Sequence, residues 1–136
     1  MKLIITAAKP NSVKPKVIFR GTSGESYTFE VYNRNFIFRK EVSAIYVFAR
    51  HNKVTNKLKP LYIGETGELS TRILNHEKWP TVIRHGCTHI CIHRVTDEKH
   101  TRLTIETDLR HRYDPPCNDQ NVPASARVLP LQRLGV

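Results

Sequence analysis

The first third of the chain carries three short runs rich in β-branched and aromatic residues, at positions 16–20, 27–32 and 35–39. In the second run hydrophobic and polar residues alternate, which is the pattern of a strand with one buried face. Turn-forming residues separate the runs at 21–24 and 33–34. The pattern predicts a small β-hairpin or meander that follows a loose polar lead-in.

Two later runs are apolar on both faces. Residues 43–50 predict a central strand, and residues 61–64 predict a second buried strand that pairs with it as an antiparallel hairpin. The polar and basic residues 51–59 predict a long loop between the two strands. Thr66 is a suitable N-cap, and it predicts a helix that runs from there to about Lys78.

The last third predicts one more strand and one long helix. Residues 88–95 alternate in hydrophobicity and predict a third strand. Thr96 or Asp97 is a suitable N-cap for a helix that ends just before Asp114-Pro115-Pro116, because proline cannot continue a helix. Apolar residues spaced by four make one buried stripe along this helix, namely Ile105, Leu109 and Tyr113.

These elements predict an α/β (α+β) fold in which a small central antiparallel sheet is flanked by helices. The 136 residues suit one domain of ordinary size. We divide the chain into a β-rich N-terminal extension at 1–42, a central domain at 43–120, and a basic C-terminal tail at 121–136 without acidic residues.

Several features favour a cytoplasmic protein. No apolar run approaches the roughly 20 residues that span a bilayer, and the apolar stretch at the N-terminus is too short for the core of a signal peptide. The three cysteines give no paired disulfide framework, which suits a reducing compartment.

The net charge of the chain indicates which class of partner it binds. Twenty-two Lys and Arg against twelve Asp and Glu give a net charge of +10. A small domain this basic commonly binds a polyanion, because each phosphate it neutralises releases condensed counterions. The alternative is that the charge serves solubility alone. The number of arginines, whose planar guanidinium matches phosphate oxygens, favours nucleic acid.

Chemistry-bearing residues follow these elements in a set order: Tyr46, Tyr62, Arg72, Glu106 and Asn118. Their order and spacing over residues 43–120 resemble the GIY-YIG nuclease superfamily. Ala44-Ile45-Tyr46 stands in place of the first tripeptide, and Tyr62-Ile63-Gly64 matches the second. Alanine is the smallest residue with a Cβ, so the strand should tolerate Ala44 unless φ is positive there.

The resemblance implies a divalent-metal-dependent endonuclease that hydrolyses DNA phosphodiester bonds. Glu106 would be the single carboxylate that anchors Mg²⁺ (or Mn²⁺), with waters and phosphate oxygens completing the shell. Arg72 would clamp the phosphate and neutralise the charge that develops on it. His76, one turn further along the same predicted helix, would contact the phosphate or share in proton transfer. Taken singly, each side chain would also suit an ordinary surface position.

The remaining assignments concern the tyrosines, one asparagine and the DNA contacts. The resemblance implies that Tyr46 takes a proton from the attacking water and that Tyr62 positions water or substrate. A phenol with a pKa near 10 is a poor base at neutral pH, and both would also suit strand positions at the core edge. Asn118 is expected to brace its loop against a neighbouring strand. The predicted DNA contacts are Gly64, Arg72 and three lysines of the 51–59 loop, Lys53, Lys57 and Lys59.

A cluster of cysteines and histidines invites a second metal hypothesis. In a regular strand Cys87, His89, Cys91 and His93 would share one face, where they could form a soft-metal site with Cys117. The spacing matches neither half of a zinc finger, so ordinary strand packing is the favoured interpretation.

Three other functions remain open at the level of sequence. One is a non-cleaving nucleic-acid-binding module of the same fold, although Arg72 and Glu106 are both present. Another is an RNA-directed nuclease or binder, because phosphate chemistry does not distinguish the sugar. The third is a basic structural protein. The partners expected are DNA, with RNA not excluded, and either a second copy in a homodimer or a protein that supplies the target. No membrane partner is expected.

Overall fold

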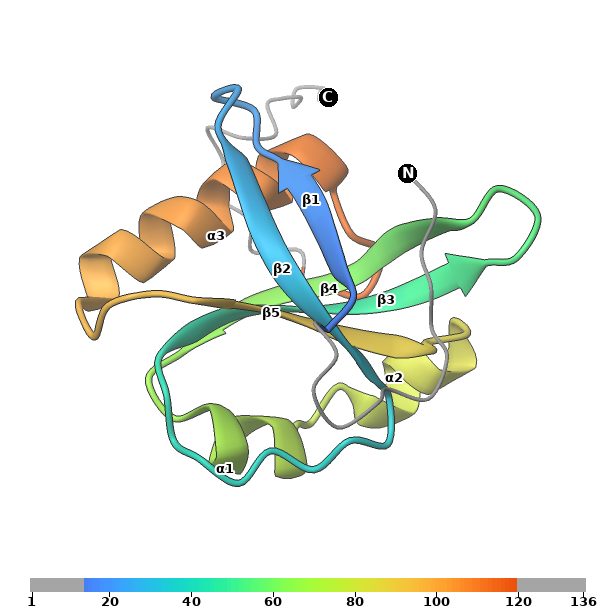
Figure 1. Cartoon of the computed structure of the whole chain (residues 1–136), viewed down its shortest axis with the longest axis horizontal. Helices are drawn as coiled ribbons and strands as arrows, with labels where there is room; N and C mark the ends of the chain where they lie inside the picture. The colour runs from blue at the N-terminus through green and yellow to red at the C-terminus, as the bar shows by residue number, and fades with distance from the viewer. Residues whose placement is uncertain (1–13, 120–136) are drawn as a thin grey trace, which may run out of the picture.

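The computed structural model of the chain describes residues 14–119, which form a five-stranded antiparallel sheet with helices on both faces (Figure 1). The strands lie in the order β1-β2-β5-β3-β4. Within the described residues, none of the helices is long and apolar enough to cross a membrane. The elements are β1 (Lys16–Arg20), β2 (Ser26–Asn33), β3 (Ala44–Asn52), β4 (Lys57–Thr66), α1 (Leu69–Leu74), α2 (Trp79–Arg84), β5 (His89–Arg94) and α3 (Lys99–Tyr113).

Strand β3 lies between two apolar clusters, one on each face of the sheet, as its two-sided apolar pattern predicts. Alternate side chains point to opposite faces of a strand. Tyr46 and Phe48 therefore pack beneath α1 and α2, while Ile45 and Val47 pack against Leu109 of α3. Figure 1 shows the same division, with α3 on one side of the sheet and α1 and α2 on the other. The predicted α+β architecture is thereby confirmed.

The N-terminal hairpin is part of this sheet. β2 pairs antiparallel with β5, and Val31 is the register partner of Cys91. The hairpin turn is also tied to α3, because the Asp108 carboxylate accepts hydrogen bonds from the Ser23 N–H at 2.8 Å and the Tyr27 hydroxyl at 2.8 Å. Strands β1 and β2 thus share one core with the rest of the sheet.

Residues 35–39, predicted as a strand, form none. A turn follows β2, in which the Asn33 carbonyl accepts the N–H of Phe36 at 3.0 Å. Both edges of β2 are already paired, with β1 and with β5, so no place beside it is free. Phe36 and Phe38 pack instead against the ring of Tyr32.

The connection between β3 and β4 is shorter than the predicted loop at 51–59. Both strands extend into that segment, because Leu58 is buried and continues the apolar pattern of β4. A tight turn at 53–56 remains. Asn56 takes a φ of +57° there, a conformation that asparagine tolerates.

The helix predicted over residues 66–78 is shorter: α1 ends at Leu74, and a second short helix, α2, begins only at Trp79, beyond the predicted end. The predicted N-cap, Thr66, is not the cap of α1: the N-cap is Glu68, which makes no side-chain capping bond, and the Thr66 hydroxyl accepts the Glu68 N–H at 2.9 Å just before the helix. The indole N–H of Trp79 then donates to the Ile73 carbonyl at 2.6 Å and satisfies a group that the end of α1 leaves free. The chain between the helices bends and carries His76 into the core.

The predicted single face of cysteines and histidines was wrong for Cys87, because β5 begins only at His89. Cys87 packs with Cys117 on the α1 side of the sheet, whereas Cys91 lies in the cluster on the α3 side. Burial raises the pKa of the Cys87 and Cys91 thiols. Over residues 14–119, no three His, Cys, Asp or Glu side chains group as metal ligands.

Candidate active site

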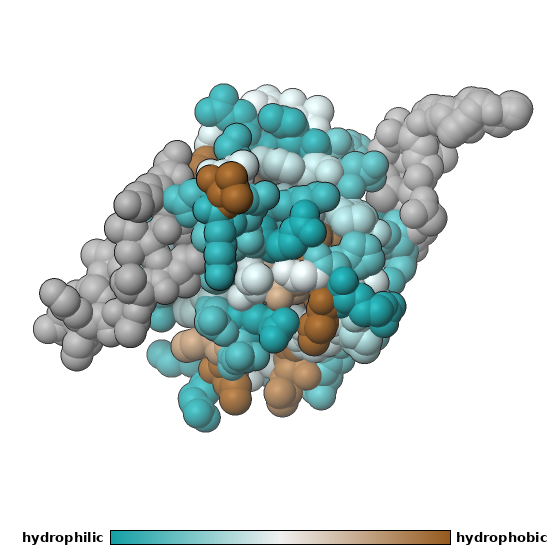
Figure 2. Space-filling model, turned by 90° about the vertical axis from the view of Figure 1, so that its right-hand side faces the viewer, coloured by the Kyte–Doolittle hydropathy of each residue, from teal (hydrophilic) through white to brown (hydrophobic). Residues whose placement is uncertain are grey.

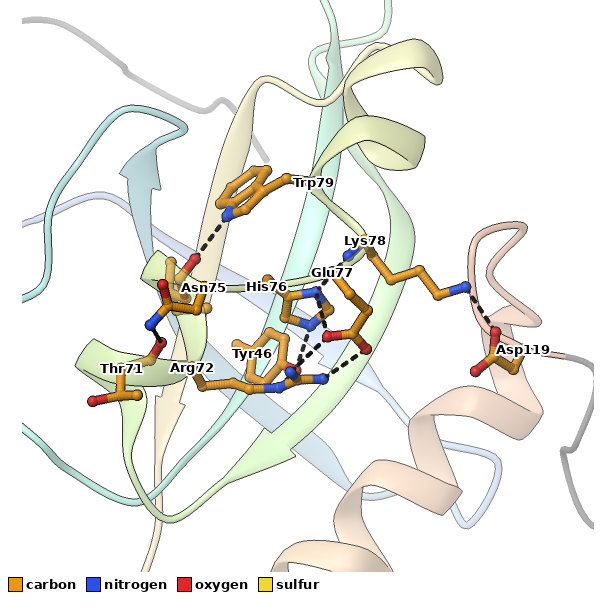
Figure 3. A network of polar contacts seen from close by, with 10 residues as sticks. Tyr46, Thr71, Arg72, Asn75, His76, Glu77, Lys78, Trp79 and Asp119 are labelled. Atoms are coloured by element: carbon orange, nitrogen blue, oxygen red, sulfur yellow. Dashed lines mark hydrogen bonds and ion pairs between the residues drawn. The ribbon is translucent and has the colours of Figure 1, made fainter.

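The phenol of Tyr46 is the centre of a buried polar network (Figure 3). Tyr46 comes from β3 and is 1% exposed. Its register partner in β4 is Gly64, and its hydroxyl lies so close to the Gly64 Cα that a Cβ there would clash with it. The phenol therefore depends on glycine at position 64. Ala44, which begins β3, has no positive φ, so its replacement of the first motif glycine is tolerated as expected.

His76 contacts the Tyr46 oxygen from the bend between α1 and α2. Its Nε2 lies 2.8 Å from that oxygen, and its Nδ1 accepts the backbone N–H of Lys78 at 3.0 Å. Since a backbone N–H can only donate, the neutral ring carries its proton on Nε2 and donates it to Tyr46. Burial, with the nearby charge of Arg72, lowers the pKa of His76 to about 4, so the ring is neutral at pH 7.

Arg72 of α1 is the second donor to Tyr46. Its Nε donates to the phenol oxygen at 3.3 Å, while its two terminal nitrogens bind the Glu77 carboxylate at 2.7 and 3.1 Å. Figure 3 shows the guanidinium extended between Tyr46 and Glu77. The hydrogen bond with Arg72 lowers the pKa of Glu77 to about 2. Glu77 is largely exposed, so this ion pair contributes little stability and an incoming anion can displace it.

Tyr62 connects this network to α3. Its ring stacks on that of Tyr46, with centroids 6.1 Å apart and planes inclined by 23°. Burial raises the pKa of both phenols. The charges of Arg72 and Glu106 both act on Tyr62, the first lowering its pKa and the second raising it. Tyr62 therefore lies within the fields of the predicted phosphate clamp and the predicted metal anchor.

Glu106 is a carboxylate enclosed by protein without a close partner. Its side chain is 15% exposed, and its nearest cation, the Arg110 guanidinium, is 3.9 Å away. Burial raises its pKa to about 7, with Arg110 opposing the shift and Glu65 adding to it. Within the described part of the chain, the Glu106 carboxylate takes part in no hydrogen bond of ordinary length, whereas Glu65 accepts the Nε of Arg102 at 2.8 Å.

The donor set around Glu106 fits a weakly held divalent cation. Among residues 14–119, no three His, Cys, Asp or Glu side chains come together around it. Mg²⁺ accepts such a site because it keeps most of its waters and binds through one or two carboxylates. Within residues 14–119, the buried Nε of Arg110 also has no hydrogen-bond acceptor, although its terminal nitrogens face Glu106 and the Asp119 carbonyl. An N–H donor without an acceptor beside a weakly paired carboxylate suits a group that brings both positive charge and oxygen atoms.

Asn118 closes the open edge of β4 behind the tyrosines. Its side-chain oxygen accepts the N–H of Ile63 at 2.9 Å, and its amide donates to the Ile63 carbonyl at 2.9 Å. The Cys117 N–H donates to the Leu61 carbonyl at 2.9 Å. Because these bonds occupy the backbone on both sides of Tyr62, they fix the strand that presents it.

The three lysines lie away from this network. Lys53 sits in the β3–β4 turn, and Lys57 and Lys59 lie on β4 toward that turn. Gly64 is seven residues from Lys57 along the strand, a separation of about 23 Å at the usual rise per residue. All three side chains are exposed. Their contact with DNA stays a prediction, and it would require a duplex that extends along the hairpin.

Sequence reasoning missed Glu77 and Arg110. Glu77 lies outside any regular helix, so no helical spacing from Arg72 indicated that the two would pair. Arg110 lies one turn after Glu106 on α3, and that spacing was a usable signal. The roles of the predicted catalytic residues remain predictions, but the fold brings Tyr46, Arg72 and His76 into direct contact.

The buried imidazole of His76 predicts a loss of stability in acid. Its pKa is about 4 in the folded protein and near 6.5 when exposed, so the unfolded chain binds the extra proton between these values. Stability from this group is complete above pH 6.5 and is lost as the pH falls toward 4. We expect the free energy of unfolding, measured with urea, to decrease between pH 7 and pH 4. The decrease should be about 3 kcal/mol larger for the wild type than for His76→Gln. Equal pH profiles would contradict a neutral, buried His76.

Comparison with known proteins gives a likeness of fold. No family model and no curated protein matches the chain. Two crystal structures of the GIY-YIG N-terminal endonuclease domain of UvrC from Thermotoga maritima, each a point mutant bound to its catalytic divalent cation, are similar at 24% and 23% identity. Each match covers 62% of this chain and 90% of that domain, with a TM-score of 0.48.

Proposed function

We propose that this chain is a divalent-metal-dependent endonuclease that hydrolyses DNA phosphodiester bonds. One observation carries the proposal: a buried phenol oxygen receives N–H donors from Arg72 and His76, while α3 holds Glu106 enclosed, with its nearest cation 3.9 Å away. Phosphodiester hydrolysis needs a base, a clamp for phosphate charge and an anchor for a cation. The arrangement offers one candidate for each.

Tyr46 is the proposed acceptor of the proton from the attacking water. In its phenolate form the oxygen would be stabilised by the two N–H donors, His76 at 2.8 Å and Arg72 at 3.3 Å. The water oxygen bonds to phosphorus, its proton passes to the phenolate, and one ester P–O bond breaks. Because burial raises the pKa of Tyr46, further positive charge near the phenol is needed to populate the phenolate at neutral pH.

Arg72 is the proposed clamp. Its terminal nitrogens already bind a carboxylate bidentately in Glu77, and a phosphate presents the same pair of oxygens. DNA phosphate would replace Glu77, while the Nε contact keeps the guanidinium aligned with Tyr46. Tyr62 would orient water or substrate from the adjacent strand.

Glu106 is the proposed anchor for Mg²⁺ or Mn²⁺. A cation held there would supply positive charge to the leaving oxygen. The protein's own contribution is to hold a single carboxylate in a partly dry site. Arg110 beside it would bind a second phosphate oxygen, because its Nε is unsatisfied. The net charge of +10 would raise the local concentration of DNA.

The proposal is tested by incubating the wild type with supercoiled, linear, branched and single-stranded DNA and with a folded RNA, in Mg²⁺ or in EDTA. Cleavage in Mg²⁺ alone is the expected result, and the ranking of substrates gives the specificity. Arg72→Lys should cut about 10²–10³-fold more slowly, because an ammonium cannot make the bidentate contact and the Tyr46 contact together.

Glu77→Gln is the matched control. It removes the displaceable partner of Arg72 and keeps the guanidinium, so cleavage should be retained and DNA affinity should rise. If all variants bind DNA and none cuts any substrate, the chain is a binding module and the catalytic proposal fails. If cleavage occurs equally in EDTA, the metal assignment fails.

A further inference from the structure

An aromatic cluster outside the candidate active site lines the connection between β2 and β3. The rings of Tyr32, Phe36 and Phe38 lie with centroids 4.7 to 4.9 Å apart. Phe36 is 44% exposed and the adjacent Ile37 is 58% exposed. Figure 2 shows hydrophobic residues grouped at the lower end of the face it displays, the end at which Figure 1 places α1 and this connection. The core does not account for these exposed side chains.

Two hollows meet at this cluster, and Phe36 and Phe38 line both. The first, of about 180 Å³, lies between the connection and the helices and is bordered by Trp79 and Arg34. The second, of about 310 Å³, is bordered by four further cations. We call the two hollows together the aromatic groove. The cations of the second hollow are Lys14, Arg39, Lys40 and Arg94.

The charge of the aromatic groove is almost entirely positive. Its one acid, Glu30, already accepts the Tyr32 hydroxyl at 2.8 Å. Across the described residues, none of the five groove cations forms an ion pair. The Nζ of Lys14 lies 4.5 Å from the centroid of the Tyr32 ring, so positive charge stands directly over the aromatic surface.

The aromatic groove lies on the other side of α1 from the candidate active site. Ser70 and Leu74 line it, and they share one helix face because they are four residues apart. Arg72 is midway between them in sequence and therefore points to the opposite face. The groove and the Tyr46 network are separate surfaces that meet through one short helix.

We propose that the aromatic groove binds single-stranded nucleic acid. The exposed ring of Phe36, with the partly buried ring of Phe38 beside it, offers a stacking surface for an unpaired base. The surrounding arginines and lysines offer partners for the adjacent phosphates. A duplex keeps its bases stacked on one another and cannot use the rings. An apolar protein segment would give the five cations no negative charge to pair with, so charge complementarity favours the polyanion.

This inference deepens the proposed function, because it gives the proposed nuclease an unpaired segment of substrate beside its active site. The binding itself requires neither the metal nor cleavage. It is therefore measured in EDTA, where a failure of catalysis has no influence on the result.

The test measures the affinity of the full chain for fluorescein-labelled dT20 and for a 20-base-pair duplex, with fluorescence anisotropy and with the emission of Trp79, the single tryptophan. The dT20 strand should quench Trp79, which borders the groove. Phe36→Leu keeps an apolar side chain but removes the ring, and it should raise the Kd for dT20 about fivefold or more. The Kd for the duplex should change less than about twofold.

A variant that removes one positive charge gives a second measurement of dT20 binding, and it leaves the aromatic side chains unchanged. Arg39→Gln should weaken dT20 binding and reduce the slope of log K against log salt by about 0.7, the value for one phosphate contact to a single strand. Arg20→Gln is the matched control, an exposed arginine on β1 at the far edge of the sheet, and it should change the dT20 affinity less than Arg39→Gln does.

Three results would overturn the proposal. The first is an unchanged dT20 affinity in both Phe36→Leu and Arg39→Gln. The second is an equal loss of dT20 and duplex binding in Phe36→Leu, which would make the effect nonspecific. The third is a wild-type dimer that becomes a monomer in Phe36→Leu by light scattering, which would assign the groove to a second copy of the chain.

Discussion

Glu106→Gln should lose metal-dependent cleavage by about 10²-fold or more and at the same time become more stable. The amide matches the carboxylate in size but lacks the negative charge that a divalent cation requires. The wild-type carboxylate is 85% enclosed, and its closest cation is 3.9 Å away. Because a charge buried with so little compensation is unfavourable, replacing it with a neutral group should raise the free energy of unfolding by about 1–3 kcal/mol.

Both halves of this prediction can be measured on the same sample. Cleavage is followed with Mg²⁺, and unfolding is followed with urea at pH 8 in EDTA so that no metal contributes. Glu68→Gln, an exposed position before α1, is the control and should change neither quantity. A less stable Glu106→Gln protein would identify Glu106 as a structural partner of Arg110. Full activity in Glu106→Gln would end its assignment as the anchor.

Gly64→Ala is the second change with a large expected effect. An added Cβ at this position would overlap the Tyr46 phenol, which is 1% exposed and has no room to move. Overpacking of this kind costs about 1–3 kcal/mol. The phenol would also be displaced from His76 and Arg72, so cleavage should fall with stability.

Gly67→Ala provides the comparison three residues further along. A Cβ there would meet the Arg102 guanidinium at 3.4 Å and the Ser43 hydroxyl at 3.9 Å, both ordinary contact distances, and the φ of Gly67 is not positive. Its thermal midpoint should stay within about 2 °C of the wild type, whereas that of Gly64→Ala should fall by about 4 °C or more. Equal midpoints for the two variants would show that the β4 backbone shifts to accommodate the methyl group.

Hydrophobic pattern located most strands and the long helix, because those segments are buried on regular faces. The double-sided apolar run at 43–50 indicated a strand between two layers, and β3 lies between two core clusters. The stripe of Ile105, Leu109 and Tyr113 likewise indicated the face of α3 that packs on the sheet. Local sequence is informative where one periodicity holds over several residues.

The secondary-structure predictions failed where contacts between distant segments determine the conformation. Residues 35–39 have strand composition, but β1 and β5 already occupy both edges of β2. The pairing of β2 with β5 joins segments about 60 residues apart, and no local signal gives that order. The break between α1 and α2 accompanies contacts with β3, in which His76 binds the Tyr46 hydroxyl and Trp79 stacks on Phe48.

The sequence named the residues of the candidate site, but it did not give their hydrogen bonds or protonation states. Motif spacing named Tyr46 and Arg72, and the predicted helix added His76; the fold brings all three into contact, although His76 lies in the bend after α1. It did not show that Arg72 is held by Glu77, nor that His76 is neutral with its proton directed at Tyr46. Those properties depend on burial and on single hydrogen bonds.

The edge of β4 bears on how copies of this chain can associate. An uncovered strand edge recruits further strands and promotes aggregation. Here Asn118 and Cys117 occupy the outward backbone groups at Leu61 and Ile63. Pro60 offers no N–H, and the exposed Lys57 and Lys59 place charge on the remainder. The part of β4 that presents Tyr62 is thus protected from pairing with a strand of a second copy.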